Sequence, residues 1–234
     1  MKRKTFILLA LAIALVTFNT YAQDGTGSNR SVSGFNRVES GGPFNIHIKI
    51  NGTESLRLDV DADLLDDIKT EVVGGTLKIG FKHNFSFHRN IKRGDIYITA
   101  KSLEGLGNSG SGSTEVEGVM DGQNVSVTLS GSGGIKTAVK TSSLQVKISG
   151  SGSINLKGNA NDADFRISGS GEINGRELKT ESAIAGISGS GNVYVSANKS
   201  VSARITGSGG VSYSGNAAIT ETKFTGSGRV NKVD

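Results

Sequence analysis

From about residue 104 onward, apolar and polar residues alternate in short runs that recur at a regular interval. In one such run Ala163, Phe165 and Ile167 alternate with polar residues, and the runs before and after it follow the same scheme. Each run ends in Gly-Ser-Gly, and in all copies but the first an apolar residue follows two positions later, as Ile173 does here. Strict alternation is typical of a strand with one buried face. Each unit is therefore predicted to be a short strand, a tight Gly-Ser-Gly corner and a second strand.

The Gly-Ser-Gly triplet occurs seven times, at intervals of 18 to 21 residues. A unit of this length is too short to bury its own apolar side, whereas stacked copies can bury theirs against one another. Glycine at the corners permits positive φ without a steric penalty. A β-propeller is the rival repeat fold, but its blades usually need about 40 residues or more. We therefore predict an all-β fold, a parallel β-helix (solenoid) of about 19-residue rungs with Gly-Ser-Gly corners.

The region before the repeat also alternates like strands, for example at Phe44, Ile46 and Ile48, although it lacks the triplet. Gly74-Gly75 predicts a tight turn between two strands. The one expected helical turn lies at 63–69. We interpret residues 35–103 as an irregular β-strand region that forms the first rungs of the same domain as the repeat solenoid at 104–234, with a small separate sheet as the alternative. Residues 23–34, rich in Gly, Ser, Asn and Asp, are expected to be a flexible lead-in.

The N-terminus has the organisation of a secretory signal peptide, predicted over residues 1–22. Basic residues at 2–4 precede an apolar stretch at 6–18, and Thr20-Tyr21-Ala22 offers a small-x-small cleavage site. The apolar stretch is shorter than the ~20 residues that a spanning helix needs. We therefore expect an exported protein with no transmembrane segment after cleavage, located in the periplasm, at the cell surface or outside the cell.

Charge and composition exclude several classes of protein. The formal net charge is +5, but removal of residues 1–22 would leave 23 Lys and Arg against 21 Asp and Glu. That small excess argues against nucleic-acid binding. The absence of cysteine excludes disulfides, thiolate metal sites and a cysteine nucleophile.

The order of these segments resembles a known bacterial family. Phe35-Asn36-Arg37-Val38, Gly42-Pro43-Phe44-Asn45-Ile46, Leu56-Arg57-Leu58-Asp59-Val60 and Gly75-Thr76-Leu77-Lys78-Ile79 precede the run of Ser-Gly-Ser-Gly units. This arrangement is similar to the family called putative auto-transporter adhesin, head GIN domain, over roughly residues 35–230. The resemblance implies a β-helical protein of the bacterial envelope, and it brings no catalytic residues with it.

Motifs for catalysis, cofactors or metals are not convincing in this sequence. The segment 131–137 resembles a phosphate loop but has Ile135 where the pattern requires Gly. Asp59, Asp61 and Asp63 match the start of an EF-hand loop, which then fails at its sixth and twelfth positions. The three histidines, His47, His83 and His88, are interpreted as surface residues. We therefore expect no catalytic, cofactor-binding or metal-binding residues and no cofactor.

A carbohydrate-active enzyme is the main alternative, because such enzymes need clustered carboxylates. Asp162, Asp164 and Glu172 fall within one rung, and alternation places Asp164 and Arg166 on the outer side, opposite Phe165. A solvated outer face is the simpler interpretation. The two tyrosines of the repeats that look exposed, and could form a sugar platform, are Tyr194 and Tyr213.

The corner serines form the one regular feature that the fold does not require. They could be a polar ladder that binds a glycan or another surface, or they could satisfy backbone groups at the corners, which we favour. This candidate surface ladder consists of Ser111, Ser132, Ser151, Ser170, Ser190, Ser208 and Ser227.

Together these patterns predict an exported cell-envelope β-helix, an adhesin or surface-binding domain without catalytic activity. The expected partner is a glycan or another cell-surface ligand, and no nucleic acid. Exposed end strands of a solenoid also allow self-association. The alternatives are a carbohydrate-active enzyme and a periplasmic structural scaffold.

Overall fold

The computed structural model describes residues 27–82 and 94–233, and most of them lie in β-strands. The one helical segment in these ranges is the 3-10 turn η1 (Ala62–Leu64). It overlaps only the start of the turn expected at 63–69, and residues 68 and 69 already belong to a strand. The predicted signal peptide, His83 and His88 lie outside the described residues. In chain order the strands are β1 (Ser28–Arg30), β2 (Arg37–Gly41), β3 (Asn45–Ile50), β4 (Ser55–Val60), β5 (Ile68–Val73), β6 (Thr76–Phe81), β7 (Gly94–Ala100), β8 (Gly105–Gly110), β9 (Ser113–Gly131), β10 (Gly134–Gly150), β11 (Ser153–Gly169), β12 (Glu172–Gly189), β13 (Asn192–Gly207), β14 (Gly210–Ser214), β15 (Ala218–Gly226) and β16 (Arg229–Lys232).

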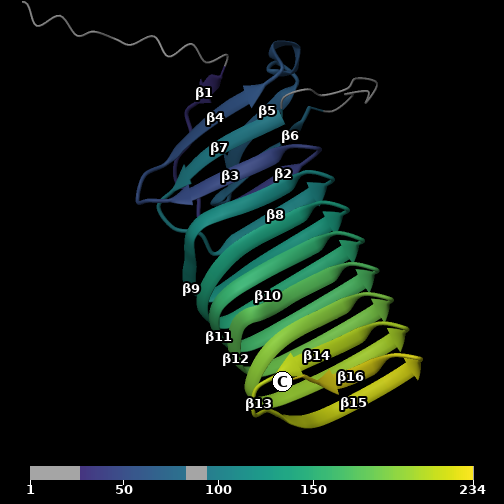
Figure 1. Cartoon of the computed structure of the whole chain (residues 1–234). Helices are drawn as coiled ribbons and strands as arrows, with labels where there is room; N and C mark the ends of the chain where they lie inside the picture. The colour runs from purple at the N-terminus through teal and green to yellow at the C-terminus, as the bar shows by residue number, and fades with distance from the viewer. Residues whose placement is uncertain (1–26, 83–93, 234) are drawn as a thin grey trace, which may run out of the picture.

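The repeat region is a stack of parallel turns, which Figure 1 shows from β8 down to β16. Strand β10 pairs in parallel with β9 on one side and β11 on the other, and Gly150 stands level with Gly131 and Gly169. The prediction of a parallel β-solenoid with about 19 residues per turn is confirmed. The turns of β9 to β13, however, are each one long bent strand rather than two short ones, because the pairing continues around the second bend, as at Val139 and Gly158. The last turn is divided into the two short strands β14 and β15, as predicted.

Inward side chains stack in columns along the axis of the solenoid and form its core. Phe165 is level with Val146 in one neighbouring turn and with Ala185 in the other. None of the three is more than 2% exposed, as the alternation predicted. The small Ala185 leaves room for the large ring of Phe165, which keeps the interior close-packed. Burial of a large apolar side chain such as Val146 or Phe165 contributes about 1.5–3 kcal/mol to the stability of the fold.

Each Gly-Ser-Gly corner requires glycine at both ends. Gly169 has φ +122°, and a Cβ atom there would lie 2.4 Å from the carbonyl oxygen of Gly150, one turn earlier. That oxygen accepts hydrogen bonds from the N–H groups of Ser170 and Gly171, each at 3.0 Å. A Cβ at Gly171 would lie 2.7 Å from the carbonyl oxygen of Gly152. The corners therefore repeat because successive backbones meet too closely for any side chain.

The N-terminal strands belong to the same sheet as the solenoid. Strand β2 pairs in parallel with β8, and β3 pairs in parallel with both β7 and β9. Antiparallel pairs join β4 to β7 and β5 to β6, and the turn between β5 and β6 uses Gly74 and Gly75, both with positive φ. Buried residues from Phe35 to Ala217 form one hydrophobic cluster. The irregular region thus shares its core with the regular turns.

Part of the segment expected to be a flexible lead-in, 23–34, is paired in the sheet. Ser28–Arg30 form β1, antiparallel to β4. The carboxylate of Glu54 accepts hydrogen bonds from the N–H groups of Gly34 (2.9 Å) and Phe35 (3.2 Å). The expectation is wrong for this part of the segment, because pairing along a sheet edge uses backbone groups and leaves little trace in a polar sequence.

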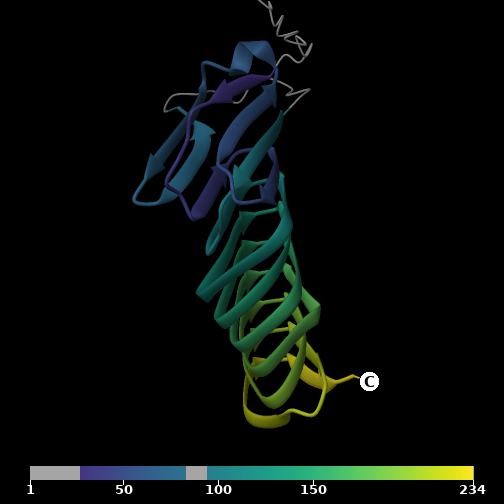
Figure 2. The same ribbon diagram turned by 90° about the vertical axis from the view of Figure 1, so that its left-hand side faces the viewer.

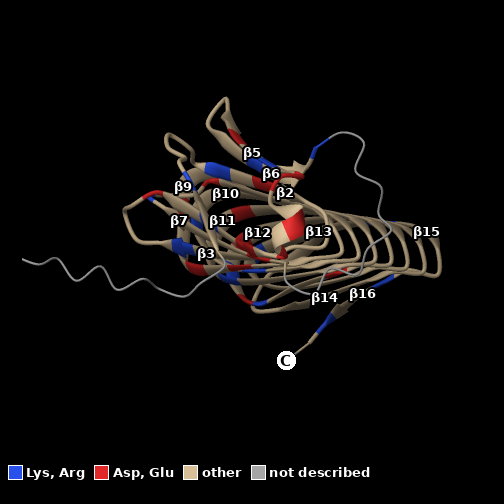
Figure 3. Ribbon diagram, turned by 90° about the horizontal axis from the view of Figure 1, so that it is seen from above, with Lys and Arg blue, Asp and Glu red and all other residues tan. Residues whose placement is uncertain are grey.

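The stack has two outward faces that meet at the corners. Figure 2 shows the turns rising along one axis, and Figure 3, seen from above, shows their corners aligned in one edge. The strand halves that follow a corner expose a first set of side chains, which we call the post-corner face. The halves that precede a corner expose the second set, which we call the pre-corner face. Lys136 lies on the former and Lys147 on the latter.

Candidate functional site

The seven corner serines stand in one exposed column along the edge of the stack. The backbone N–H of Ser151 donates to the carbonyl oxygen of Gly131 at 3.1 Å, and Ser170 repeats this bond to Gly150 at 3.0 Å. The backbone of the ladder therefore joins successive turns, while the side chains face solvent. None of these serines lines the grooves described below.

A second hydroxyl column lies two residues before the corner serines, and the sequence interpretation overlooked it. Ser149 stands level with Ser130 and Ser168, and all three are exposed. The signal was visible, since a Ser or Thr precedes every triplet in the sequence. The full column is Ser109, Ser130, Ser149, Ser168, Ser188, Thr206 and Thr225.

The post-corner face carries a continuous row of polar and aromatic side chains, one from each strand. Pairing register places Arg57 beside Tyr97, Tyr97 beside His47, and His47 beside Glu115. The row runs from the N-terminal strands into the regular turns because the two regions form one sheet. Its further members are Lys136, Asn155, Asn174, Tyr194 and Ser212.

A groove of about 750 Å³ lies over the N-terminal half of this row and has an aromatic centre. The rings of His47 and Tyr97 stack with centroids 4.9 Å apart and an interplanar angle of 17°. The guanidinium carbon of Arg57 lies 5.9 Å from the centroid of the Tyr97 ring. Tyr97 is 44% exposed. The hydroxyls of Ser55 and Thr99 lie 2.8 Å apart on the same wall. The groove thus offers a partly exposed aromatic pair surrounded by hydrogen-bonding groups.

Ion pairs fix the charged side chains around this aromatic groove. Lys49 Nζ lies 2.8 Å from Glu117, and Lys136 Nζ donates to Glu115 at 2.9 Å. The hydrogen bond from Lys136 lowers the pKa of Glu115, and the same contact raises the pKa of Lys136. Both groups are therefore charged at neutral pH. Lys157 also lines the groove, and no ion pair to it is found within the described residues.

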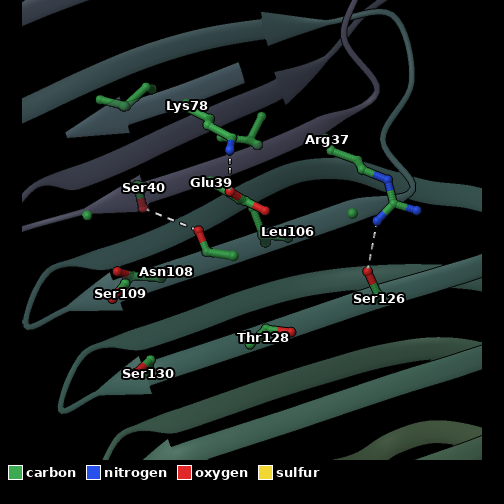
Figure 4. Close-up of a pocket in the computed structure, with 15 residues that line it drawn as sticks. Arg37, Glu39, Ser40, Lys78, Leu106, Asn108, Ser109, Ser126, Thr128 and Ser130 are labelled. Carbon is green, nitrogen blue, oxygen red and sulfur yellow. Dashed lines mark hydrogen bonds and ion pairs between the residues drawn. The ribbon is translucent and has the colours of Figure 1, made fainter. Parts of the chain in front are cut away.

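A smaller hollow of about 410 Å³ lies on the pre-corner face between β2, β6, β8 and β9 (Figure 4). Lys78 Nζ lies 4.0 Å from Glu39, and Arg37 donates to the hydroxyl of Ser126 at 3.4 Å. A Cβ at Gly105 would lie 2.7 Å from the side chain of Arg37. Because glycine has no side chain, Arg37 can occupy this space. Within this hollow Lys78 and Glu39 face each other, and Arg37 is held by a hydroxyl.

The three carboxylates considered for an enzyme are divided between the two faces. Asp164 lies on the pre-corner face and holds the Arg166 guanidinium, with Nη2 to Oδ2 at 2.9 Å. The predicted outward placement of this pair is confirmed, and so is the burial of Phe165. Asp162 precedes the pair on the same strand, whereas Glu172 follows the corner. The described residues therefore place these carboxylates in no common cleft.

The prediction that Tyr194 and Tyr213 are both exposed is wrong for Tyr213 and right for the outward orientation of Tyr194. Tyr213 is 4% exposed, because its register with Val195 puts it in an inward column. Tyr194 faces outward, and the guanidinium carbon of Arg176 lies 3.5 Å from its ring centroid. His47, which was expected to be a surface residue, has a side chain that is 43% exposed, and its Nε2 lies 3.1 Å from Oδ1 of Asp95.

No metal centre and no membrane helix is found in the ranges that the structure describes. Those residues contain no group of three or more His, Cys, Asp or Glu side chains placed to hold a metal ion. Within the same ranges no helix has the length and apolarity to span a bilayer.

The fold and its surface define an all-β parallel solenoid that presents polar outer faces. The chain belongs to the family described as putative auto-transporter adhesin, head GIN domain, whose model matches residues 34–217. The resemblance noted from the sequence is thereby confirmed. No curated protein sequence is similar enough to count as a relative.

Solved bacterial structures share the fold over nearly their whole length. A putative adhesin from Bacteroides fragilis has a TM-score of 0.83 at 24% identity, covering 88% of this chain and 96% of that one. A putative lipid binding protein from Parabacteroides distasonis has a TM-score of 0.72 at 26% identity, covering 90% and 98%. A putative adhesin from Parabacteroides merdae has a TM-score of 0.71 at 23% identity, covering 89% and 96%.

Proposed function

We propose that this protein is an exported, non-catalytic domain of the cell envelope that adheres to glycans through its post-corner face. The observation that carries the proposal is the aromatic groove, where Tyr97 lies open beside His47 and Arg57. An aromatic ring offers a flat apolar surface, and nearby polar groups fix the orientation of a ligand. Sugars present the matching combination of an apolar ring face and a rim of hydroxyls. Membership of an adhesin family supports this proposal.

Binding is tested with an array of immobilised oligosaccharides and a pair of tyrosine variants. Tyr97→Ala removes the aromatic surface of the groove, and we expect a loss of binding of roughly tenfold, since aromatic contacts dominate such sites. Tyr194→Ala is the matched control, because Tyr194 lies on the same face but outside the groove. Equal effects of the two substitutions, or none, would refute the assignment.

Location is tested by protease treatment of intact cells, with detection by an antibody against the repeat region. We expect loss of signal without lysis, as for a protein exposed at the surface. Full protection until the outer membrane is opened would end the adhesin proposal and favour a periplasmic scaffold.

The alternative that the protein is an enzyme is tested by substitution of the three carboxylates of β11 and β12. We expect the wild-type protein to show no turnover of the bound oligosaccharides. Replacing Asp162, Asp164 and Glu172 together by Ala should leave binding at the aromatic groove unchanged, because none of the three lines that groove. Turnover that is lost in this variant would establish a carbohydrate-active enzyme instead.

For the corner ladder we infer a structural role. The backbone amides of Ser151 and Ser170 join successive turns, and that role does not use the hydroxyls. Ser151→Ala with Ser170→Ala should therefore leave both binding and folding unchanged. A loss of glycan binding in this double variant would make the ladder the functional surface.

Self-association through the last turn is a further part of the proposal. Strand β15 pairs with β13 along one edge, and Ile219 and Phe224 on it are 47% and 44% exposed. If two copies of β15 pair antiparallel around Thr222, Glu221 of each copy stands opposite Lys223 of the other. Opposite charges in such cross-strand positions are favourable. Strand β15 is thus complementary to a second copy of itself.

A further inference from the structure

A row of cationic side chains runs along the pre-corner face, and of its members only Lys223 enters the self-association proposed above. Lys147 stands level with Arg166, and Arg204 stands level with Lys223. Gly186 occupies the position between the two arginines. The row therefore extends over five successive turns, with one side chain missing at its centre. All four cationic side chains are exposed.

Like charges at neighbouring positions of a sheet repel one another, because adjacent strands lie about 4.8 Å apart. Carboxylates in the neighbouring column of side chains offset this repulsion. Arg166 is held by Asp164 at 2.9 Å, and Arg204 lies 3.5 Å from Glu221. These pairs orient the two guanidinium groups, and each has further N–H donors that one carboxylate does not occupy. No ion pair to Lys147 is found within the described residues.

The missing side chain at Gly186 leaves a space between the two arginines. A Cβ atom there would meet no heavy atom within 4 Å. Ile184, two residues earlier on the same strand, is 55% exposed and gives the space an apolar wall. The position lies in a groove of about 720 Å³ that spans β9 to β13 and reaches β15.

Hydroxyl groups accompany the cationic row along its whole length. The second hydroxyl column runs two residues further along each strand, and Ser149, Ser168, Ser188 and Thr206 of that column line the same groove. Their register repeats with the turns, so each cationic position has a hydroxyl beside it. The groove thus combines positive charge, hydrogen-bonding hydroxyls and one apolar wall in a repeating pattern.

We propose that this groove is a second binding site, specific for an extended acidic glycan whose carboxylate or sulfate groups contact the cationic row. A sugar ring fits the space at Gly186, against Ile184, with an acidic group on either arginine. Guanidinium groups bind such oxyanions with charge-assisted hydrogen bonds. A nucleic acid fits less well, because the row lies beside two carboxylates, Asp164 and Glu221, and the apolar Ile184 rather than in a broad basic patch. The site lies across the corners from the aromatic groove and goes beyond the function proposed for that groove.

The test uses purified protein and oligogalacturonate, a chain of uronic acids, with neutral dextran as the uncharged probe. The double variant Lys147→Gln/Arg204→Gln removes two cations of the row. We expect its affinity for oligogalacturonate, measured by calorimetry, to fall roughly tenfold or more, and to depend less steeply on salt. Lys136→Gln/Lys157→Gln is the matched control, because it removes the same number of cations from the post-corner face.

Two substitutions at Gly186 distinguish the effect of an added negative charge on glycan binding from the effect of filling the space. Gly186→Glu places a carboxylate between the two arginines and should abolish binding, whereas the isosteric Gly186→Gln should weaken it less. The absence of any heavy atom within 4 Å of a Cβ at this position predicts that both variants fold. An unchanged unfolding midpoint would verify this.

The proposal would be overturned by equal losses in the two double variants, by equal binding of dextran and oligogalacturonate, or by tighter binding of duplex DNA than of oligogalacturonate. Tyr97→Ala should retain oligogalacturonate binding, which distinguishes a failure of this site from a failure of the aromatic groove. If Tyr97→Ala loses it, the acidic glycan binds at the aromatic groove and the second site is refuted.

Discussion

Substitution of a single corner glycine should destabilise the solenoid far more than its small volume implies. In Gly169→Ala the new methyl group would lie 2.4 Å from the carbonyl oxygen of Gly150. The backbone there has φ +122°, a conformation that costs a residue with a Cβ about 1–3 kcal/mol. The same carbonyl accepts two hydrogen bonds at 3.0 Å, each worth about 0.5–1.5 kcal/mol. The expected loss of unfolding free energy is therefore roughly 3 kcal/mol or more.

Gly186→Ala is the matched control, because the same methyl group meets no heavy atom within 4 Å there and φ is not positive. We expect this variant to be neutral or to gain about 0.5–1 kcal/mol, since glycine weakens a strand relative to alanine. Urea unfolding followed by far-ultraviolet circular dichroism measures both. If Gly169→Ala is as stable as Gly186→Ala, the corner is not a close backbone contact, and the steric reason given for the repeat is incorrect.

Three further predictions concern the core, the N-terminal segment and the last turn. Phe165→Ala should lower the free energy of unfolding by about 3–5 kcal/mol, whereas Ile184→Ala on the outer face should change it by less than about 0.5 kcal/mol; similar values in urea unfolding would contradict the core assignment. The hydrogen bond from Lys101, followed by those from backbone amides, lowers the pKa of Glu54 from its ordinary 4.5. Its stabilisation is therefore present above pH 4.5 and lost as the pH falls through the lowered pKa, so the unfolding midpoints of wild type and Glu54→Gln should converge in acid; a constant difference would contradict this. Thr222→Pro should abolish self-association in light scattering because proline cannot donate to a strand ladder, and an unchanged mass would refute pairing through β15.

The architecture was predictable because its determinants are local and repeated. Alternation placed Phe165 inside and Arg166 outside, and the spacing of the triplets gave the turn length, all of which the structure confirms. The prediction of two short strands per unit was wrong for the turns of β9 to β13, because the second bend keeps its backbone pairing, as at Gly158. The pairing of Ser28–Arg30 was missed as well, since it depends on a strand 25 or more residues away.

The candidate sites depended on register, which alternation does not give. The sequence has Arg57, Tyr97 and His47 in three separate strands, and only their pairing brings them together on one face. Tyr213 looked exposed but falls in the inward column with Val195. The cationic row was equally hidden, because its members are about 19 residues apart and are unremarkable one at a time.

The sequence by itself determined the class of fold, since a 19-residue unit with one apolar side can bury that side only against copies of itself. It also determined where the corners lie, because no residue with a Cβ fits where the backbones of successive turns meet. The tertiary structure alone decided which outward residues become neighbours. That choice follows from the inter-turn hydrogen-bond register, and a shift of one residue would exchange the inner and outer faces. The aromatic groove and the cationic row are therefore properties of the stack rather than of any single turn.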